Sequence, residues 1–248
     1  LEQSIRGMRE ACIILETPVT GGNCSMYHET GGSPIYPTPV IGMVGLLDDA
    51  TRAVNAHFRR PGEAIILLGE TRGHLGGSSY WAHVLSTVAG APPPVDLAAE
   101  RRLIDLLVDS ARDLLLASAH DLSDGGLAVA LAEACIGGPY VEGGEPHGAR
   151  VDLREVQGHL ATDAVLFGED HGRALISVPA NDADRLLARA KGAGVPARVI
   201  GTVGERLGRL EIVLRDSTLR IGSPGLRETY YTAIPRRMEP VASQDAAD

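Results

Sequence analysis

Two patterns of apolar residues along the chain predict its helices and strands. Between residues 1 and 15, apolar side chains recur at spacings of three and four, which places them on one face of a helix. These side chains are Ile5, Met8, Cys12 and Leu15. Unbroken apolar runs at 40–46 and 64–69 are instead typical of strands that are buried on both faces. Helices combined with buried strands predict an α/β protein with mixed sheets.

The alternation of helices and strands continues through the chain. Asp96 can cap a helix that runs to about residue 117, and its apolar stripe consists of Leu103, Leu107, Ala111, Leu114 and Leu115. Further helices are expected at 48–58, from about 127 to a stop at Gly137, at 182–191 and from Ser223 onward. Further strands are expected at 172–178, 197–204 and 210–214, and an exposed loop at 141–149.

Charge and composition exclude several classes of function. The 248 residues are 44% hydrophobic, enough to bury a real core, and carry a formal net charge of −9. Basic residues occur singly or in pairs, so no nucleic-acid-binding surface is expected. The only lysine of the sequence, Lys191, does not lie in a P-loop. Phosphate chemistry would therefore depend on backbone N–H groups, arginine or a metal ion.

The cysteines and the hydropathy of the chain suggest a cytoplasmic protein. Cys12, Cys24 and Cys135 lie far apart and form no C-x-x-C pair, so neither a disulfide framework nor a zinc site is expected. No apolar run approaches the roughly 20 residues that span a bilayer, so no membrane contact is expected. Because the chain begins with Leu1 and enters a helix at once, we expect it to be a piece of something longer.

A turn at residues 20–25 is the first stretch that could carry chemistry. Gly22 has no Cβ, so its backbone N–H can approach an anion such as phosphate. The amide oxygen of Asn23 suits a Mg²⁺ ion that is shared with a nucleotide, and Ser25 can bond the same or a neighbouring ligand. The same residues also suit an ordinary turn, in which polar side chains bond only their own backbone.

Two later turns allow competing interpretations. The Gly-rich loop at 73–80 suits either an anion site at a helix N-terminus or a serine cap. In the turn at 120–126, His120, Asp121 and Asp124 could bind a metal, with Asp170-His171 after Glu169 as further ligands, so a metal-dependent hydrolase is one hypothesis. Their spacing matches no common zinc motif, and the two aspartates can equally cap the following helix.

Four segments of the chain, in order, resemble the phosphoribosylformylglycinamidine synthase family. They are Thr17-Pro18-Val19-Thr20-Gly21-Gly22-Asn23-Cys24-Ser25 continuing to Glu29, Pro37-Thr38-Pro39 continuing to Gly45, Leu75-Gly76-Gly77-Ser78, and His120-Asp121-Leu122-Ser123-Asp124-Gly125-Gly126-Leu127. The resemblance is closest to the carboxy-terminal third of the large synthetase subunit, in the aminoimidazole-ribonucleotide-synthetase-like superfamily. It departs from the family at Cys24, where Val is usual, and at His28, where Asn is common.

The resemblance implies a division of the chain into domains. Residues 1–62 would be the last part of an amino-terminal synthetase-type sheet domain, and residues 63–235 a complete carboxy-terminal α/β domain. Independently of the resemblance, residues 236–248 are expected to be a disordered tail, because chain ends are often poorly ordered. The turn Arg59-Arg60-Pro61-Gly62, which composition alone marks as a boundary, lies where the resemblance places the border between the domains.

The resemblance also implies an activity and its site residues. The family is an ATP-dependent C–N ligase of purine biosynthesis that converts formylglycinamide ribonucleotide to the amidine with ammonia derived from glutamine. Gly22 would contact ATP, Asn23 would bind Mg²⁺ and Ser25 would contact the ribonucleotide. The implied partners are a glutamine amidotransferase subunit, a small accessory subunit and the remainder of the synthetase subunit.

The same resemblance implies that this chain holds only part of the active site. The family's catalytic histidine and most of its Mg²⁺ ligands lie in parts of the subunit that precede this segment. No catalytic residue is therefore expected here, and the chain alone is expected to be inactive. A nucleotide-binding or scaffolding module of a synthetase complex remains an alternative.

Overall fold

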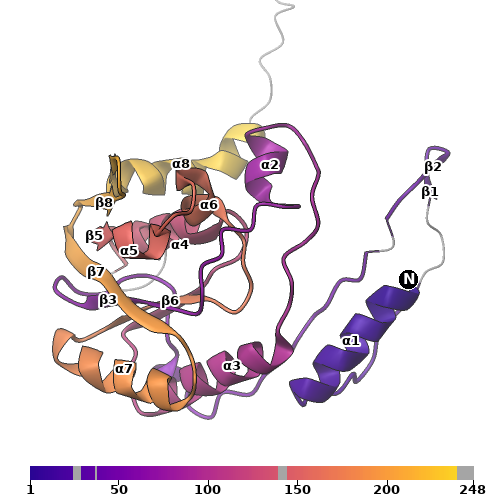
Figure 1. Ribbon diagram of the computed structural model, residues 1–248, viewed down its shortest axis with the longest axis horizontal. Helices are drawn as coiled ribbons and strands as arrows, with labels where there is room; N and C mark the ends of the chain where they lie inside the picture. Colours follow the sequence, from indigo (N-terminus) through magenta and orange to yellow (C-terminus); the bar gives the residue numbers. More distant parts are fainter. Residues whose placement is uncertain (25–28, 37, 139–143, 239–248) are drawn as a thin grey trace, which may run out of the picture.

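The computed structural model describes residues 1–24, 29–36, 38–138 and 144–238. Within them, a seven-stranded sheet has the order β4-β6-β3-β7-β5-β8-β9 (Figure 1). Its strands are β3 (Ala64–Leu68), β4 (Ser118–Asp121), β5 (His147–Asp152), β6 (Ala174–Val178), β7 (Ala197–Arg206), β8 (Arg209–Val213) and β9 (Thr218–Gly222). The pair β5 and β8 is parallel, and the other neighbours are antiparallel. The sheet confirms the expected mixed α/β fold.

Helices cover both faces of this sheet. The described helices are α1 (Glu2–Ile14), α2 (Ser79–His83), α3 (Leu97–Arg112), α4 (Gly126–Ile136), α5 (Arg154–Gln157), α6 (Thr162–Phe167), α7 (Ala183–Gly192) and α8 (Ser223–Met238), with 3-10 turns η1 (Ala50–Arg52) and η2 (Ala180–Asp182). Figure 1 shows α3 and α7 on one face and α4, α5 and α6 on the other. None of the described helices combines the length and the hydropathy that a membrane span requires.

Strand β3 shows why its sequence is continuously apolar. Ile65 and Leu67 pack into the apolar cluster under α4 and α6, whereas Ile66 and Leu68 pack into the cluster under α3 and α7. Successive side chains of a strand point to opposite faces, so a strand covered on both sides needs apolar residues at every position. All five residues of β3 are buried, as the sequence predicts.

Local capping signals are confirmed where the sequence states them clearly. The Asp96 carboxylate accepts the Ala99 N–H at 2.9 Å and begins α3. Ser78 accepts the Trp81 N–H at 3.4 Å and begins α2. Each bond satisfies one of the N–H groups that the first turn of a helix leaves without an intrahelical partner.

The expected strand at 40–46 is wrong. These residues lie outside helix and strand, and Val40, Val44 and Leu46 are 93%, 103% and 93% exposed. A strand needs a neighbour for its backbone N–H and C=O groups, and no strand among the described residues lies beside this run. Residues 1–52 hold only α1, η1 and the short hairpin of β1 (Glu29–Thr30) and β2 (Ser33–Pro34) within their described part. Figure 1 shows α1 and the hairpin apart from the large sheet.

Three further expectations need correction. The expected helix at 48–58 is only the single turn η1, because Ala53 leaves it with extended dihedral angles. Helix α3 ends at Arg112 rather than near residue 117, and Leu114, expected in its apolar stripe, is 65% exposed with a φ of 55°. The expected loop at 141–149 includes the start of the buried strand β5, and β9 was not expected at all.

Candidate functional site

The described part of the first turn, residues 20–24, lies on the surface of the structure. Gly22 and Asn23 are exposed and belong to no helix or strand, and Ser25 lies outside the described residues. A Cβ placed on Gly22 would meet nothing within 4 Å. The backbone of Gly22 is therefore open to a ligand.

A second candidate site is built around Asp170, which lies in the loop before β6, beside the loop that follows β3. Its Oδ2 atom accepts the N–H groups of Arg72 at 2.9 Å and Gly73 at 2.8 Å, and Oδ1 accepts the N–H of His74 at 3.2 Å. Asp170 is only 5% exposed. A carboxylate that accepts several backbone N–H groups forms charge-assisted bonds and fixes the loop that supplies them. Asp170 thus holds the start of the Gly-rich loop at 73–80.

The neighbouring Glu169 joins two loops that the sequence presents as separate motifs. Its Oε1 atom accepts the N–H of Ser79 at 2.9 Å and the N–H of Gly125 at 2.7 Å. Ser79 begins α2 and Gly125 is the N-cap of α4. One carboxylate oxygen therefore fixes the N-terminal start of both helices. The Gly-rich loop at 73–80 and the turn at 120–126 form one structural unit.

Arg173 bonds the segment that carries these carboxylates to the loop after β3. Its guanidinium donates to the carbonyl oxygens of Gly168 at 2.5 Å and Asp170 at 3.1 Å, and to Thr71 Oγ1 at 3.3 Å. Its side chain is fully buried, and burial lowers the pKa of this guanidinium while the charge of Asp170 raises it. The buried charge therefore depends on Asp170 as its counter-ion.

The metal-hydrolase hypothesis is not supported by the surroundings of His120. Its Nε2 atom lies 3.1 Å from Glu133 Oε2, and Nδ1 lies 2.6 Å from the Asp121 carbonyl oxygen. Both ring nitrogens thus have protein partners. Within the described residues, no group of three or more His, Cys, Asp or Glu side chains could hold a metal ion.

The alternative role of Asp121 and Asp124 as helix caps is also wrong. Asp121 ends strand β4, and its side chain is 79% exposed. The N-cap position of α4 is Gly125, with a φ of 81° and no side-chain cap bond. Glu169, distant in sequence, takes the N–H that a local aspartate was expected to take.

Close contacts at Gly126 explain why this turn is rich in glycine. Gly126 has a φ of 65°, a conformation that L side chains rarely adopt. A Cβ added there would lie 2.5 Å from the carbonyl oxygen of Gly168. The glycine therefore allows α4 to begin directly against the segment that carries Glu169 and Asp170.

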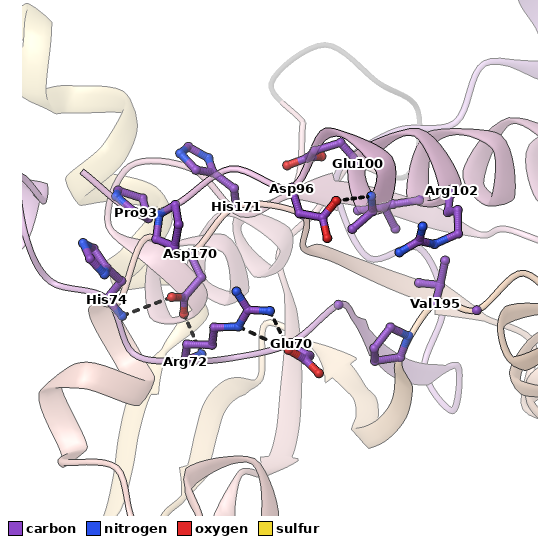
Figure 2. Close-up of a pocket in the computed structure, with 17 residues that line it drawn as sticks. Glu70, Arg72, His74, Pro93, Asp96, Glu100, Arg102, Asp170, His171 and Val195 are labelled. Carbon is purple, nitrogen blue, oxygen red and sulfur yellow. Dashed lines mark hydrogen bonds and ion pairs between the residues drawn. The ribbon is translucent and has the colours of Figure 1, made fainter. Parts of the chain in front are cut away.

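A cavity of about 330 Å³ lies beside Asp170, which forms part of its wall (Figure 2). Its walls are the loop after β3, the first turns of α3, the loop before β6 and the loop before β7. Glu70, Arg72, Asp96, Glu100, Arg102 and Asp170 are its acidic side chains and its arginines. Figure 2 shows Arg72 on the side of the loop after β3 and Arg102 on the α3 side. The hydrogen bonds that Arg72 donates to Glu70 raise the pKa of the Arg72 guanidinium, and the charges of Asp170 and Asp96 act in the same direction.

Sequence reasoning treated Asp170 only as an extra metal ligand and gave Glu169 no role, so it missed what both carboxylates do. The N–H groups that they accept come from residues 44 to 98 positions away, as in the bonds of Gly125 and Arg72. The only local sign was the nearby pair of Gly-rich loops, whose exposed backbone N–H groups need acceptors.

Comparison with known proteins assigns the larger part of the chain, including the Asp170 site, to a described family. Residues 60–212 match the family described as "AIR synthase related protein, C-terminal domain". The chain is 48% identical over 200 residues to "Phosphoribosylformylglycinamidine synthase subunit PurL" of Bradyrhizobium sp. strain BTAi1, covering 81% of this chain and 26% of the relative. It is 44% identical over 236 residues to the PurL of Parafrankia sp. strain EAN1pec, covering 94% of this chain and 29% of the relative. The chain thus spans less than a third of the length of these curated relatives.

Solved structures show the same fold at lower identity. "T. maritima PurL complexed with FGAR" matches with a TM-score of 0.61 and 22% identity, over 72% of this chain and 30% of that chain. "T. maritima PurL complexed with ATP" matches with a TM-score of 0.54 and 22% identity, over 72% of this chain and 28% of that chain. At this identity the likeness shows a shared fold.

Proposed function

The chain belongs to the family of AIR synthase related proteins, whose C-terminal domain it contains, and we propose that it forms the carboxy-terminal part of a phosphoribosylformylglycinamidine synthase. The observation that carries this proposal is the 44% identity to a PurL subunit over 94% of the chain. The reaction is the ATP-dependent conversion of formylglycinamide ribonucleotide to its amidine in purine biosynthesis. The enzyme is thus a C–N ligase that works in the cytoplasm.

The proposed assembly needs groups that this chain does not supply. Ammonia comes from glutamine through a partner amidotransferase, with a small accessory subunit and the remainder of the synthetase subunit as further partners. Phosphoryl transfer depends on several positioned charges acting together. We therefore expect the 248-residue chain alone to form no amidine, even with free ammonia. Turnover by the purified chain would contradict this part of the proposal.

The turn at 20–25 is the proposed contribution of this chain to the active site. Gly22 contacts ATP, Asn23 contributes an oxygen ligand to Mg²⁺, and Ser25 contacts the ribonucleotide. Two observations support the first two roles: the open space beside Gly22 and the exposed position of Asn23. Mg²⁺ commonly takes one or two protein oxygens and completes its shell with water and substrate phosphates. A single amide oxygen fits that pattern as one ligand among several.

A hybrid enzyme tests the proposal directly. Residues 1–248 replace the matching carboxy-terminal segment of the Parafrankia PurL, and ADP and amidine formation are measured with the amidotransferase and accessory subunits present. The proposal predicts an active hybrid, because the replaced segment is 44% identical over 236 residues. An inactive hybrid that is folded and assembled would refute it.

The same hybrid tests the proposed metal ligand. Asn23→Ala should lower kcat by about tenfold or more, since one ligand to the metal–nucleotide complex is lost. Glu10→Gln, an exposed position on α1, is the matched control and should leave the rate unchanged. Raising the Mg²⁺ concentration should partly restore the Asn23→Ala rate if Asn23 binds the ion. An Asn23→Ala hybrid with unchanged kcat and KM for MgATP would exclude this role.

Calorimetric titration of the isolated chain with MgATP addresses the alternative of a nucleotide-binding module. Micromolar binding that Asn23→Ala weakens would favour that module. Absence of binding would agree with a site that is complete only in the assembled subunit.

A further inference from the structure

The cavity beside Asp170 contains charged groups that the fold itself does not use. Most of its charges are already satisfied internally. Arg72 donates to Glu70 at 2.8 Å, Asp170 accepts three backbone N–H groups, and Asp96 caps α3. Among the acidic side chains and arginines of the lining, two are left without a hydrogen bond or ion pair to any described residue, Glu100 and the exposed Arg102. They carry opposite charges.

Glu100 and Arg102 cannot neutralise each other. Both belong to α3 and are two positions apart, and side chains at that spacing point to different sides of a helix. Glu100 lies against Gly172, whose added Cβ would be 3.6 Å from Glu100 Oε1. The Arg102 side chain lies against Gly194, whose added Cβ would be 3.8 Å from Arg102 Cδ. The two charges therefore extend from α3 toward different loops of the cavity, Glu100 toward Gly172 and Arg102 toward Gly194, so a single ligand can pair with both.

The remaining lining limits what such a ligand can be. The cavity has more carboxylates than arginines, namely Glu70, Asp96, Glu100 and Asp170 against Arg72 and Arg102. An excess of carboxylates repels a phosphate or nucleotide. Leu103, Val195 and Pro196 add apolar wall to the α3 side. A volume of about 330 Å³ suits a small molecule rather than a peptide.

We propose that this cavity is a binding site for a free α-amino acid. Arg102 pairs with its carboxylate, Glu100 pairs with its ammonium group, and the side chain lies against Leu103 and Val195. A zwitterion matches one unpaired charge of each sign and adds no net charge to the cavity. Recognition of both main-chain groups would discriminate against amines and carboxylic acids that carry only one of them. The proposal does not depend on the synthetase function.

Titration of the purified chain with the free amino acids, each up to about 10 mM, is the test. At least one should bind, whereas its decarboxylated amine and its N-acetyl derivative should bind at least tenfold more weakly. Glu100→Gln and Arg102→Gln should each lower the affinity by about tenfold or more. Asp109→Asn and Arg112→Gln, on the same helix but outside the cavity, are matched controls and should not change it.

Three results would overturn the proposal: no amino acid binds, the one-charge analogues bind as well as the parent, or both α3 variants keep wild-type affinity. Inorganic phosphate or MgATP that binds in the wild type and is lost in Arg102→Gln would identify an anion site instead. Thermal unfolding of each variant shows whether it is folded. The analogue series uses the unaltered chain, so it decides the question even if a variant does not fold. MgATP titration of Asn23→Ala is a separate measurement, which keeps this result independent of the proposed function.

Discussion

The Oε1 atom of Glu169 lies 2.7 Å from the amide nitrogen of Gly125, across 44 positions of sequence. The same oxygen accepts the N–H of Ser79. Two helices that begin in different parts of the chain therefore share one acceptor. The arrangement resembles a helix cap, except that the capping side chain comes from a third segment.

Glu169→Ala should destabilise the fold by about 1–3 kcal/mol, because two N–H groups at helix starts lose their acceptor. The measurement is the urea dependence of unfolding at neutral pH. Glu10→Ala, an exposed glutamate on α1, is the control and should change the free energy of unfolding by less than about 0.5 kcal/mol. Equal effects of the two substitutions would show that Glu169 does not hold the two loops.

Asp170→Asn should destabilise more strongly, by about 2–4 kcal/mol. The amide group replaces one acceptor oxygen with a donor that faces backbone N–H groups, and it removes the counter-ion of the buried Arg173. Asp216→Asn, at an exposed position, is the control. Unfolding by guanidinium chloride measures both. A loss below about 0.5 kcal/mol for Asp170→Asn would contradict the role given to this carboxylate.

The sequence was informative where a structural cause is local. The Asp96 cap and the apolar run of β3 depend on residues next to one another, and both were predicted correctly. The run at 40–46 has the same apolar character as β3 but no neighbouring strand among the described residues, so composition alone gave the wrong answer. An apolar run shows that a segment could form a buried strand. Whether it does so depends on a second segment that pairs with it.

The Asp170 site could not be predicted for a related reason. Its carboxylate and the N–H groups that it accepts are more than 90 positions apart, and only the topology of β3 beside β6 brings them together. His120, Asp121 and Asp124 showed the opposite error. They are adjacent in sequence and looked like one site, but the strand β4 sends His120 toward Glu133 and leaves Asp121 exposed.

Asp152 should make stability depend on pH in the acid range. Its hydrogen bonds to Arg154 lower its pKa from 3.8 to about 2. A carboxylate whose folded pKa is lowered stabilises the fold above its unfolded pKa, and this contribution is lost as the pH falls from about 4 to 2. Because the pair is largely exposed, the contribution should stay below about 1 kcal/mol.

Asp152→Asn should flatten the pH dependence of the unfolding free energy between pH 4 and 2, measured relative to wild type. High salt should reduce the difference between the two proteins, because screening weakens exposed ion pairs. Asp216→Asn again serves as the control. An unchanged slope in Asp152→Asn would mean that the carboxylate has a similar pKa in the folded and unfolded states.

Two glycine-to-alanine substitutions should change stability in opposite directions. Gly126→Ala places a Cβ 2.5 Å from the Gly168 carbonyl oxygen at a φ of 65°, so it should destabilise the fold by about 2 kcal/mol or more. Gly7→Ala adds a Cβ in open space inside α1, where alanine is the better helix former, and should stabilise that helix by about 0.5–1 kcal/mol.

Urea unfolding measures the first substitution, and amide hydrogen exchange in α1 measures the second, since α1 packs mainly on α3 and can open locally. Protection of the α1 amides should rise by about two- to fivefold in Gly7→Ala. A Gly126→Ala protein as stable as wild type would mean that α4 can move away from the Gly168 carbonyl. The close start of α4 against the segment holding Glu169 would then be a consequence of packing rather than a requirement of the fold.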